Sequence, residues 1–213
     1  MRELSLHILD LIENAVAARA SKIAVEITQV TDWNLMRIVV EDDGPGLSVS
    51  PETAMDPFYT TKNGKKTGLG LSLFRFRIEQ AGGELILDRS SLGGLAVRAT
   101  MSLVHVDRNP LGDLAATLSS VVAANPMLEL SLRIRSGGRE QVIESSEVAR
   151  QPAAPDDPAT AVHRTDDSTG SGPLAVSHAL ETARPLSVAR PMAVARQMYR
   201  KIKAGLEALQ FKE

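Results

Sequence analysis

The sequence contains no cysteine, few aromatic residues and no long apolar run. The absence of cysteine among its 213 residues excludes disulfide bonds and thiolate metal sites. Aromatic residues make up 3% of the chain, so aliphatic side chains and methionine must form the core. No apolar stretch reaches membrane-spanning length, and the N-terminus lacks the apolar segment of a signal peptide. We therefore expect a cytoplasmic protein with no membrane partner.

The chain also lacks a strong excess of charge of either sign. Its net charge is −2 and its isoelectric point is near 6.1, which gives no global electrostatic argument for nucleic-acid binding. The apolar content of 43% is sufficient for a core, and the length suits one or two domains. We therefore expect a globular protein without a nucleic-acid partner.

Hydrophobic periodicity predicts helices and strands that alternate through the first 150 residues. The expected helices lie at 4–20, 70–80 and from Asn109–Asp113 to about 124, with a short one near 51–55. The expected strands lie at 23–27, 35–41, 84–88, 95–104, 127–135 and 139–144. The last two strands could extend the sheet of the first half or pair with a second subunit.

The composition changes after Arg150. Residues 151–173 hold four prolines and four aspartates with almost no large apolar residue, which is typical of a disordered linker. The tail at 174–213 is basic and helix-prone, and Pro185 and Pro191 are expected to interrupt it. Its last helix has an apolar face from Ala195 to Leu209. We expect a second chain or an acidic partner to cover that face, with folding back onto its own domain as the alternative.

The most informative motif is Asp42–Gly46, Asp-Asp-Gly-Pro-Gly, directly after an apolar strand. A carboxylate at the end of a buried strand can accept a hydrogen bond from the amino group of adenine, and the glycines let the backbone approach the base. A second glycine turn, Lys66–Leu71, opens a helix whose free N–H groups can hold phosphate. Together the two motifs predict an ATP pocket, and their spacing fits neither a P-loop nor a dinucleotide-binding fingerprint.

Four sequence blocks, taken in order, carry a family resemblance. They are the helix at 8–19, the motif Asp42–Gly46, the segment Asp56–Lys62 and the glycine turn at 66–73. These blocks resemble the ATP-binding boxes of the GHKL superfamily, which is shared by DNA gyrase, heat-shock chaperones, histidine kinases and MutL proteins. The resemblance covers roughly residues 1–105. It implies a two-layer α/β sandwich of the Bergerat type, followed by a small α+β extension at 106–150 and C-terminal helices.

The resemblance implies a role for each matching residue, with ATP and Mg²⁺ as cofactors. Asn14 would ligate Mg²⁺, and Asp42 would bind the adenine amine. Gly44 and Gly46 would shape the base pocket. The lid and the phosphate-binding turn would be formed by a further set of residues: Thr60, Thr61, Lys62, Lys65, Thr67, Gly68, Leu69 and Gly70.

Asp10 lies four residues before Asn14 and therefore on the same helix face. In gyrase-like members a glutamate at this position activates water, so Asp10 is the candidate catalytic base, one carbon shorter. Glu13 is an adjacent competitor that points elsewhere on the helix. His7 shares the face of Asn14, and we favour an ordinary first-turn histidine there over a phosphate contact.

The resemblance also implies phosphoryl transfer to histidine, serine or threonine of a separate partner protein. No phosphoacceptor module precedes the first box, so we expect the acceptor in trans, and a homodimer is compatible with this reading. The alternative is a nucleotide-gated interaction module that hydrolyses ATP slowly or not at all. A DNA clamp of the gyrase or MutL type is disfavoured, because the sequence has neither a transducer domain nor a basic overall charge. The strand that usually precedes the first box is also missing, which would leave a sheet edge in need of cover.

Overall fold

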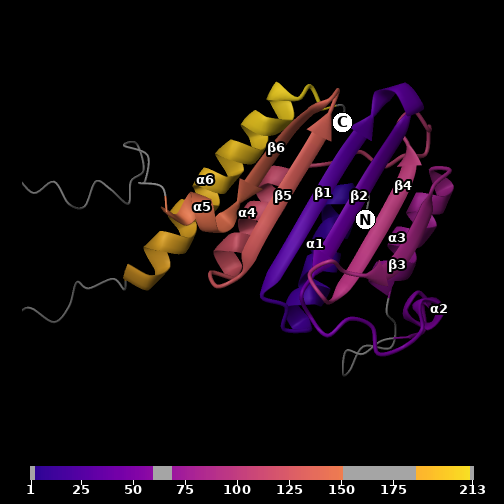
Figure 1. Cartoon of the computed structure of the whole chain (residues 1–213), viewed down its shortest axis with the longest axis horizontal. Helices are drawn as coiled ribbons and strands as arrows, with labels where there is room; N and C mark the ends of the chain where they lie inside the picture. The colour runs from indigo at the N-terminus through magenta and orange to yellow at the C-terminus, as the bar shows by residue number, and fades with distance from the viewer. Residues whose placement is uncertain (1–2, 60–68, 151–185, 212–213) are drawn as a thin grey trace, which may run out of the picture.

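The computed structural model of the chain describes residues 3–59, 69–150 and 186–211. Its centre is one mixed sheet with the strand order β3-β4-β2-β1-β5-β6 (Figure 1). The strands are β1 (Lys22–Val30), β2 (Leu35–Asp42), β3 (Glu84–Arg89), β4 (Leu95–Ser102), β5 (Glu129–Ser136) and β6 (Arg139–Glu144).

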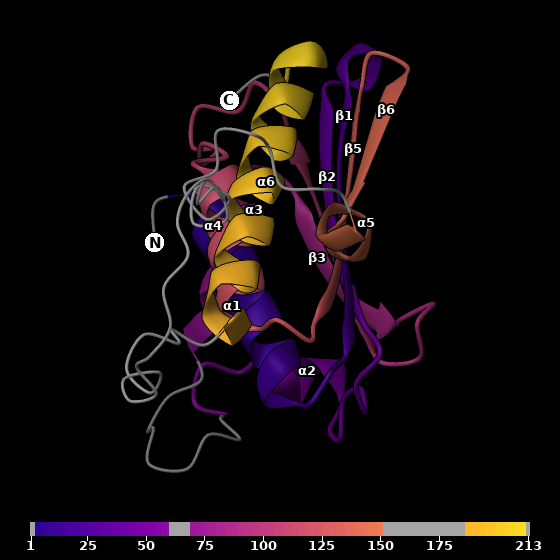
Figure 2. The same ribbon diagram turned by 90° about the vertical axis from the view of Figure 1, so that its left-hand side faces the viewer.

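The helices form the second layer. Figure 2 shows α1, α3, α4 and α6 packed on one face of the sheet. The helices are α1 (Leu4–Ala17), α2 (Pro51–Ala54), α3 (Leu69–Gln80), α4 (Leu114–Ala124), α5 (Ser145–Arg150) and α6 (Leu186–Ala208). The predicted two-layer α/β sandwich is confirmed.

The core lies between the helices and the sheet and follows directly from the sequence pattern. Strand β1 buries every second side chain, Ile23, Val25 and Ile27, because alternate residues of a strand point to opposite faces. Helix α1 buries Ile8 and Ile12 from the other side, at the spacing of one helical face. The largest buried side chains are almost all aliphatic or methionine, as the scarcity of aromatics predicted.

Strand β5 pairs with the sheet edge that we expected to be open because the usual first strand is missing. It pairs in parallel with β1, from Lys22 opposite Glu129 to Gln29 opposite Ser136. Strand β6 then pairs antiparallel with β5. The second region of the chain therefore extends the sheet of the first half, which was one of the two predicted arrangements.

Helix α6 corrects one prediction from the sequence. Its apolar side chains Met198 and Ile202 are fully buried in the same core as the rest of the domain, and Ala195 and Leu209 are almost so. Gly205 lies directly against the side chain of Gln141 in β6. The apolar face is thus covered by the chain's own domain, which is the alternative rather than the favoured docking to a partner.

The prediction that Pro191 interrupts this helix is also wrong. Helix α6 runs through Pro191 as part of one 23-residue segment. A proline inside a helix costs about 3 kcal/mol through a lost hydrogen bond and a steric clash. Burial of a large apolar side chain contributes about 1.5–3 kcal/mol, so the buried face of α6 outweighs that cost. Pro185 and the predicted linker at 151–173 lie outside the described residues.

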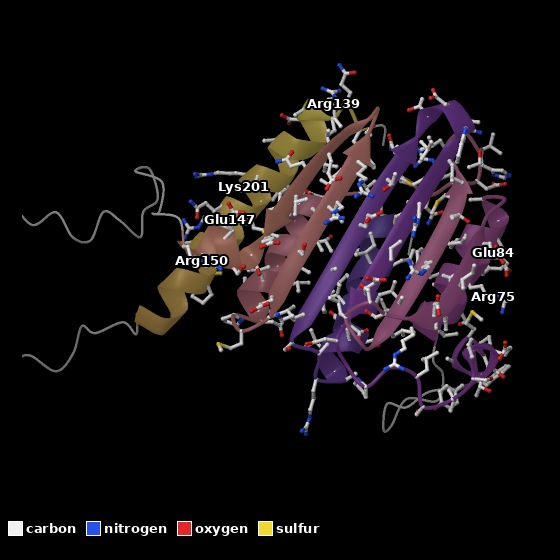
Figure 3. All side chains as sticks on the ribbon, in the orientation of Figure 1. Arg75, Glu84, Arg139, Glu147, Arg150 and Lys201 are labelled. Carbon is white, nitrogen blue, oxygen red and sulfur yellow. The ribbon has the colours of Figure 1, made fainter. Side chains whose placement is uncertain are left out.

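The sheet face away from the helices is lined by paired charges. Arg98 contacts Glu41 at 3.0 Å, and Arg135 contacts both Glu140 at 2.8 Å and Glu26 at 3.5 Å. Figure 3 shows the side chains that rise from this face, with those of α5 and α6 along one side of the molecule. These ion pairs are only partly buried, and pairs near the surface contribute little to stability. Within the described part of the chain, no helix is both long and apolar enough to span a bilayer.

Candidate nucleotide-binding site

Several of the residues singled out by the sequence, among those that the structure describes, lie at one end of the sheet. Strand β2 ends there at Asp42, and the loop that follows meets the C-terminal end of α1 (Figure 1). Helix α3 begins at the same end, with Gly70 beside Asp10 of α1. Three of the four sequence blocks are therefore brought together by the fold.

The carboxylate of Asp42 is held by its own loop and by the turn between β3 and β4. Its side chain is buried, and Oδ1 accepts hydrogen bonds from the N–H groups of Gly44 at 2.8 Å and Leu95 at 3.3 Å. Its main-chain oxygen accepts from the N–H of Gly94 at 3.0 Å. No described residue donates to Oδ2. One carboxylate oxygen is thus fixed by the protein, while Oδ2 accepts no hydrogen bond from the described residues.

The side chain of the neighbouring Asp43 forms hydrogen bonds to Ser21 and Lys22. Its Oδ1 accepts from the main-chain N–H groups of Ser21 at 2.7 Å and Lys22 at 2.9 Å, and Oδ2 accepts from the Ser21 hydroxyl at 2.5 Å. The Ser21 hydroxyl and these N–H groups lower the pKa of the Asp43 carboxyl below its usual value. Asp43 therefore ties the glycine loop to the start of β1, and Gly46 continues the loop with φ of +76°.

Gly94 is a site residue that the sequence analysis missed. The sequence identified it only as part of a hairpin turn. A Cβ at this position would overlap Asp42 Oδ1 and lie 2.6 Å from the main-chain nitrogen of Gly44. Its N–H bond to Asp42 adds a direct link between the turn and the motif. The glycine pair Gly93-Gly94 was the available signal, but a sequence cannot show which of two turn glycines is closely approached.

Asp10 lies against the first turn of α3. A Cβ at Gly70 would overlap Asp10 Oδ2, so only glycine at this position leaves room for the observed position of the Asp10 carboxylate. Carboxylates are stabilised at the N-terminus of a helix by the helix dipole. The arrangement brings the candidate base next to the turn in which the sequence predicts phosphate binding.

Asn14 is exposed on α1, and its side chain makes no hydrogen bond to the described residues. Its amide oxygen is a ligand type that suits Mg²⁺, a cation that usually keeps several waters and takes phosphate oxygens as further ligands. In the part of the chain that the structure describes, no group of three or more histidine or acidic side chains is placed so that it could hold a metal ion. A metal bound through one protein ligand and a nucleotide therefore fits the residues present, and an all-protein metal cage does not.

Most of the predicted lid lies outside the described residues. Leu69 and Gly70 open α3, and the Leu69 side chain is exposed. The structure does not describe the following predicted residues: Thr60, Thr61, Lys62, Lys65, Thr67 and Gly68.

His7 is buried rather than directed at a ligand. Its ring stacks on Phe74 of α3, with centroids 5.0 Å apart, and neither ring nitrogen has a hydrogen-bond partner among the described residues. Burial lowers the pKa of His7 from 6.5 to about 4, and the positive charge of Arg77 acts in the same direction. His7 is therefore a neutral packing residue, which agrees with the preference stated from the sequence.

A buried carboxylate with one oxygen that accepts from no described residue, a glycine loop beside it and a helix N-terminus nearby lie together at one end of this α/β domain. The model of the family described as "Histidine kinase-, DNA gyrase B-, and HSP90-like ATPase" matches residues 2–105. Residues 2–105 therefore form a domain of the GHKL type, as the four sequence blocks predicted.

Comparison with individual proteins gives partial matches. The chain is 37% identical over 92 residues to the sensor histidine kinase CpxA of Escherichia coli strain K12, which covers 39% of this chain and 20% of CpxA. The chain thus spans about a fifth of the length of the curated relatives it matches. The catalytic domain of histidine kinase ThkA is 27% identical, covers 46% of this chain and 65% of that one, and gives a TM-score of 0.37. The MutL ATPase domain of Aquifex aeolicus complexed with ADP is 15% identical, with coverage of 68% and 63% and a TM-score of 0.36.

Proposed function

We propose that this protein binds Mg-ATP and transfers the γ-phosphate to a histidine, serine or threonine of a separate partner protein. The observation that carries the nucleotide part is the geometry of Asp42, whose Oδ1 is held by two N–H groups while Oδ2 accepts from no described residue. The free oxygen suits the exocyclic amine of adenine. The family match and the likeness to a sensor kinase support the transfer part.

The other site residues would bind the metal, bind the phosphates and accept a proton. Asn14 would hold Mg²⁺, which supplies charge neutralisation for the phosphates when bound. The N–H groups at the start of α3 would hold phosphate oxygens. Asp10, which lies against Gly70, would accept the proton of the attacking group. In the transfer, the acceptor atom forms a bond to the γ-phosphorus, the bond to the bridging oxygen breaks, and ADP leaves.

The transfer itself is tested by incubating the protein with γ-labelled ATP and fractionated extract of the source cells. Label on a second protein, absent when Asp42→Asn is used in place of the wild type, supports the proposal. Binding of ATP without any labelled acceptor, and without release of phosphate, would favour the nucleotide-gated interaction module instead.

The first prediction concerns nucleotide affinity. Asp42→Asn should weaken Mg-ATP binding about tenfold or more, because a hydrogen bond to a charged group contributes about 1.5–3 kcal/mol. Asn14→Ala should weaken binding in Mg²⁺ more than in its absence, because it removes the amide oxygen that would ligate the metal. Isothermal titration calorimetry measures both. The matched control is Asp43→Asn, whose carboxylate bonds to Ser21 and Lys22 instead. Equal affinity in the wild type and both site variants would refute the assignment.

The second prediction separates chemistry from binding. Asp10→Asn should lower turnover about a hundredfold and leave ATP affinity unchanged, because a general base acts in the transition state. The control is Glu13→Gln, which lies next to Asn14 but is exposed on another side of α1. Steady-state phosphate release and a separate affinity measurement provide the comparison. Full turnover in Asp10→Asn would assign the proton transfer to another group.

A further inference from the structure

The turn between β3 and β4 is tied to the end of β2 by three hydrogen bonds. The N–H of Gly94 donates to the main-chain oxygen of Asp42 at 3.0 Å, and the N–H of Leu95 donates to its Oδ1 at 3.3 Å. The hydroxyl of Ser91 donates to Glu41 Oε2 at 2.8 Å. This turn lies outside the four motif blocks, yet it lies directly against the side chain of Asp42.

Gly94 is a glycine for reasons of space. A side chain there would overlap Asp42 Oδ1 and press on the nitrogen of Gly44, and these two atoms form the hydrogen bond that orients the carboxylate. Gly93 differs: its φ of +113° favours glycine, while nothing lies within 4 Å of a Cβ built on it. Gly93 is thus needed for the backbone conformation of the turn, and Gly94 is needed for the space beside Asp42.

We propose that Gly94 is a positioning residue that sets the preference of the site for adenine. It allows Asp42 to keep the rotamer in which Oδ1 is held by the protein and Oδ2 faces the exocyclic amine of the base. A purine with an oxo group at that position cannot donate to Oδ2, so the fixed carboxylate disfavours it. This inference rests on the proposed function and adds the residue that determines base specificity.

The experiment compares ATP with inosine triphosphate, which carries oxygen in place of the amine. The wild type should bind ATP about tenfold or more tightly than inosine triphosphate, from the loss of one charge-assisted hydrogen bond. Gly94→Ala should lose most of this preference while its affinity for inosine triphosphate stays the same. Gly93→Ala strains the same turn without placing atoms near Asp42, so it should keep the wild-type ratio. Combining Gly94→Ala with Asp42→Asn should change the ratio no further than Asp42→Asn alone.

The outcomes are separable. A wild type that binds neither nucleotide contradicts the proposed function itself. A wild type that prefers ATP, together with a folded Gly94→Ala that prefers it equally, overturns the role of Gly94 alone. If Gly94→Ala melts below the assay temperature, Ser91→Ala replaces it, because it cuts a tie of the same turn without adding atoms. Ser91→Ala should lower the ratio about twofold, and an unchanged ratio would overturn the inference.

Discussion

Replacing Met198 with alanine should lower the free energy of unfolding by about 2–5 kcal/mol, the range for removing a fully buried large aliphatic or methionine side chain. Met198 is wholly buried in the core cluster, on a helix that follows the rest of the domain by 35 residues that the structure does not describe. The lost side chain leaves a cavity between α6 and the elements it packs on. Urea unfolding followed by circular dichroism measures the change.

The same helix offers a matched control. Met192 is 47% exposed, so Met192→Ala should change stability by about 0.5 kcal/mol at most. Equally small effects of both substitutions would mean that α6 leaves the domain in solution. A large effect of Met198→Ala, with unchanged association state by light scattering, supports α6 as part of the domain's own core.

Acidification from pH 7.5 to pH 5 should destabilise the protein by about 2 kcal/mol through His7 alone. The pKa of His7 is about 4 in the folded protein and 6.5 in the unfolded chain. The unfolded chain therefore binds the proton first as the pH falls. The stability that depends on neutral His7 is complete above pH 6.5 and is lost progressively between pH 6.5 and about pH 4.

Other groups also titrate over this range, so the comparison is made with a variant. His7→Leu should reduce the pH dependence of unfolding by about the same 2 kcal/mol, whatever its effect on stability at pH 7.5. An unchanged slope in His7→Leu would contradict the buried, neutral state of this ring.

The sequence predicted the secondary structure of the first 150 residues well, because apolar periodicity there is strong and turns are marked by glycine. It did not determine what covers an apolar face. The apolar side chains from Ala195 to Leu209 indicate that this face of the helix must be buried, but they do not identify the surface that buries it. In the structure the chain's own domain covers the face. Helix α5 was not predicted, since its start depends on Ser145, whose hydroxyl accepts from Leu130 N–H at 2.9 Å in the tertiary structure.

The site was predictable where its residues are close in sequence. Asp42 and its glycines form one motif, and Asp10 and Asn14 share one helix face. The support from the β3–β4 turn was not predictable, because Leu95 lies 53 positions after Asp42 and neither residue type is unusual at its position. Where two backbone segments far apart in the sequence approach closely, the only sign in the sequence is a glycine. Glycines in turns are common for other reasons, so such a contact cannot be inferred from them.

The parallel pairing of β1 with β5 has a consequence for the nascent chain during synthesis. Synthesis delivers the motifs of the nucleotide site early, but β1 keeps one edge unpaired until the ribosome has added roughly a hundred more residues. An exposed edge invites pairing with other chains, and long-range strand pairing is slow to form. A nascent or truncated chain that ends near residue 105 would therefore hold all four sequence blocks and still present an open strand to its neighbours. The C-terminal half completes the domain that the N-terminal half begins.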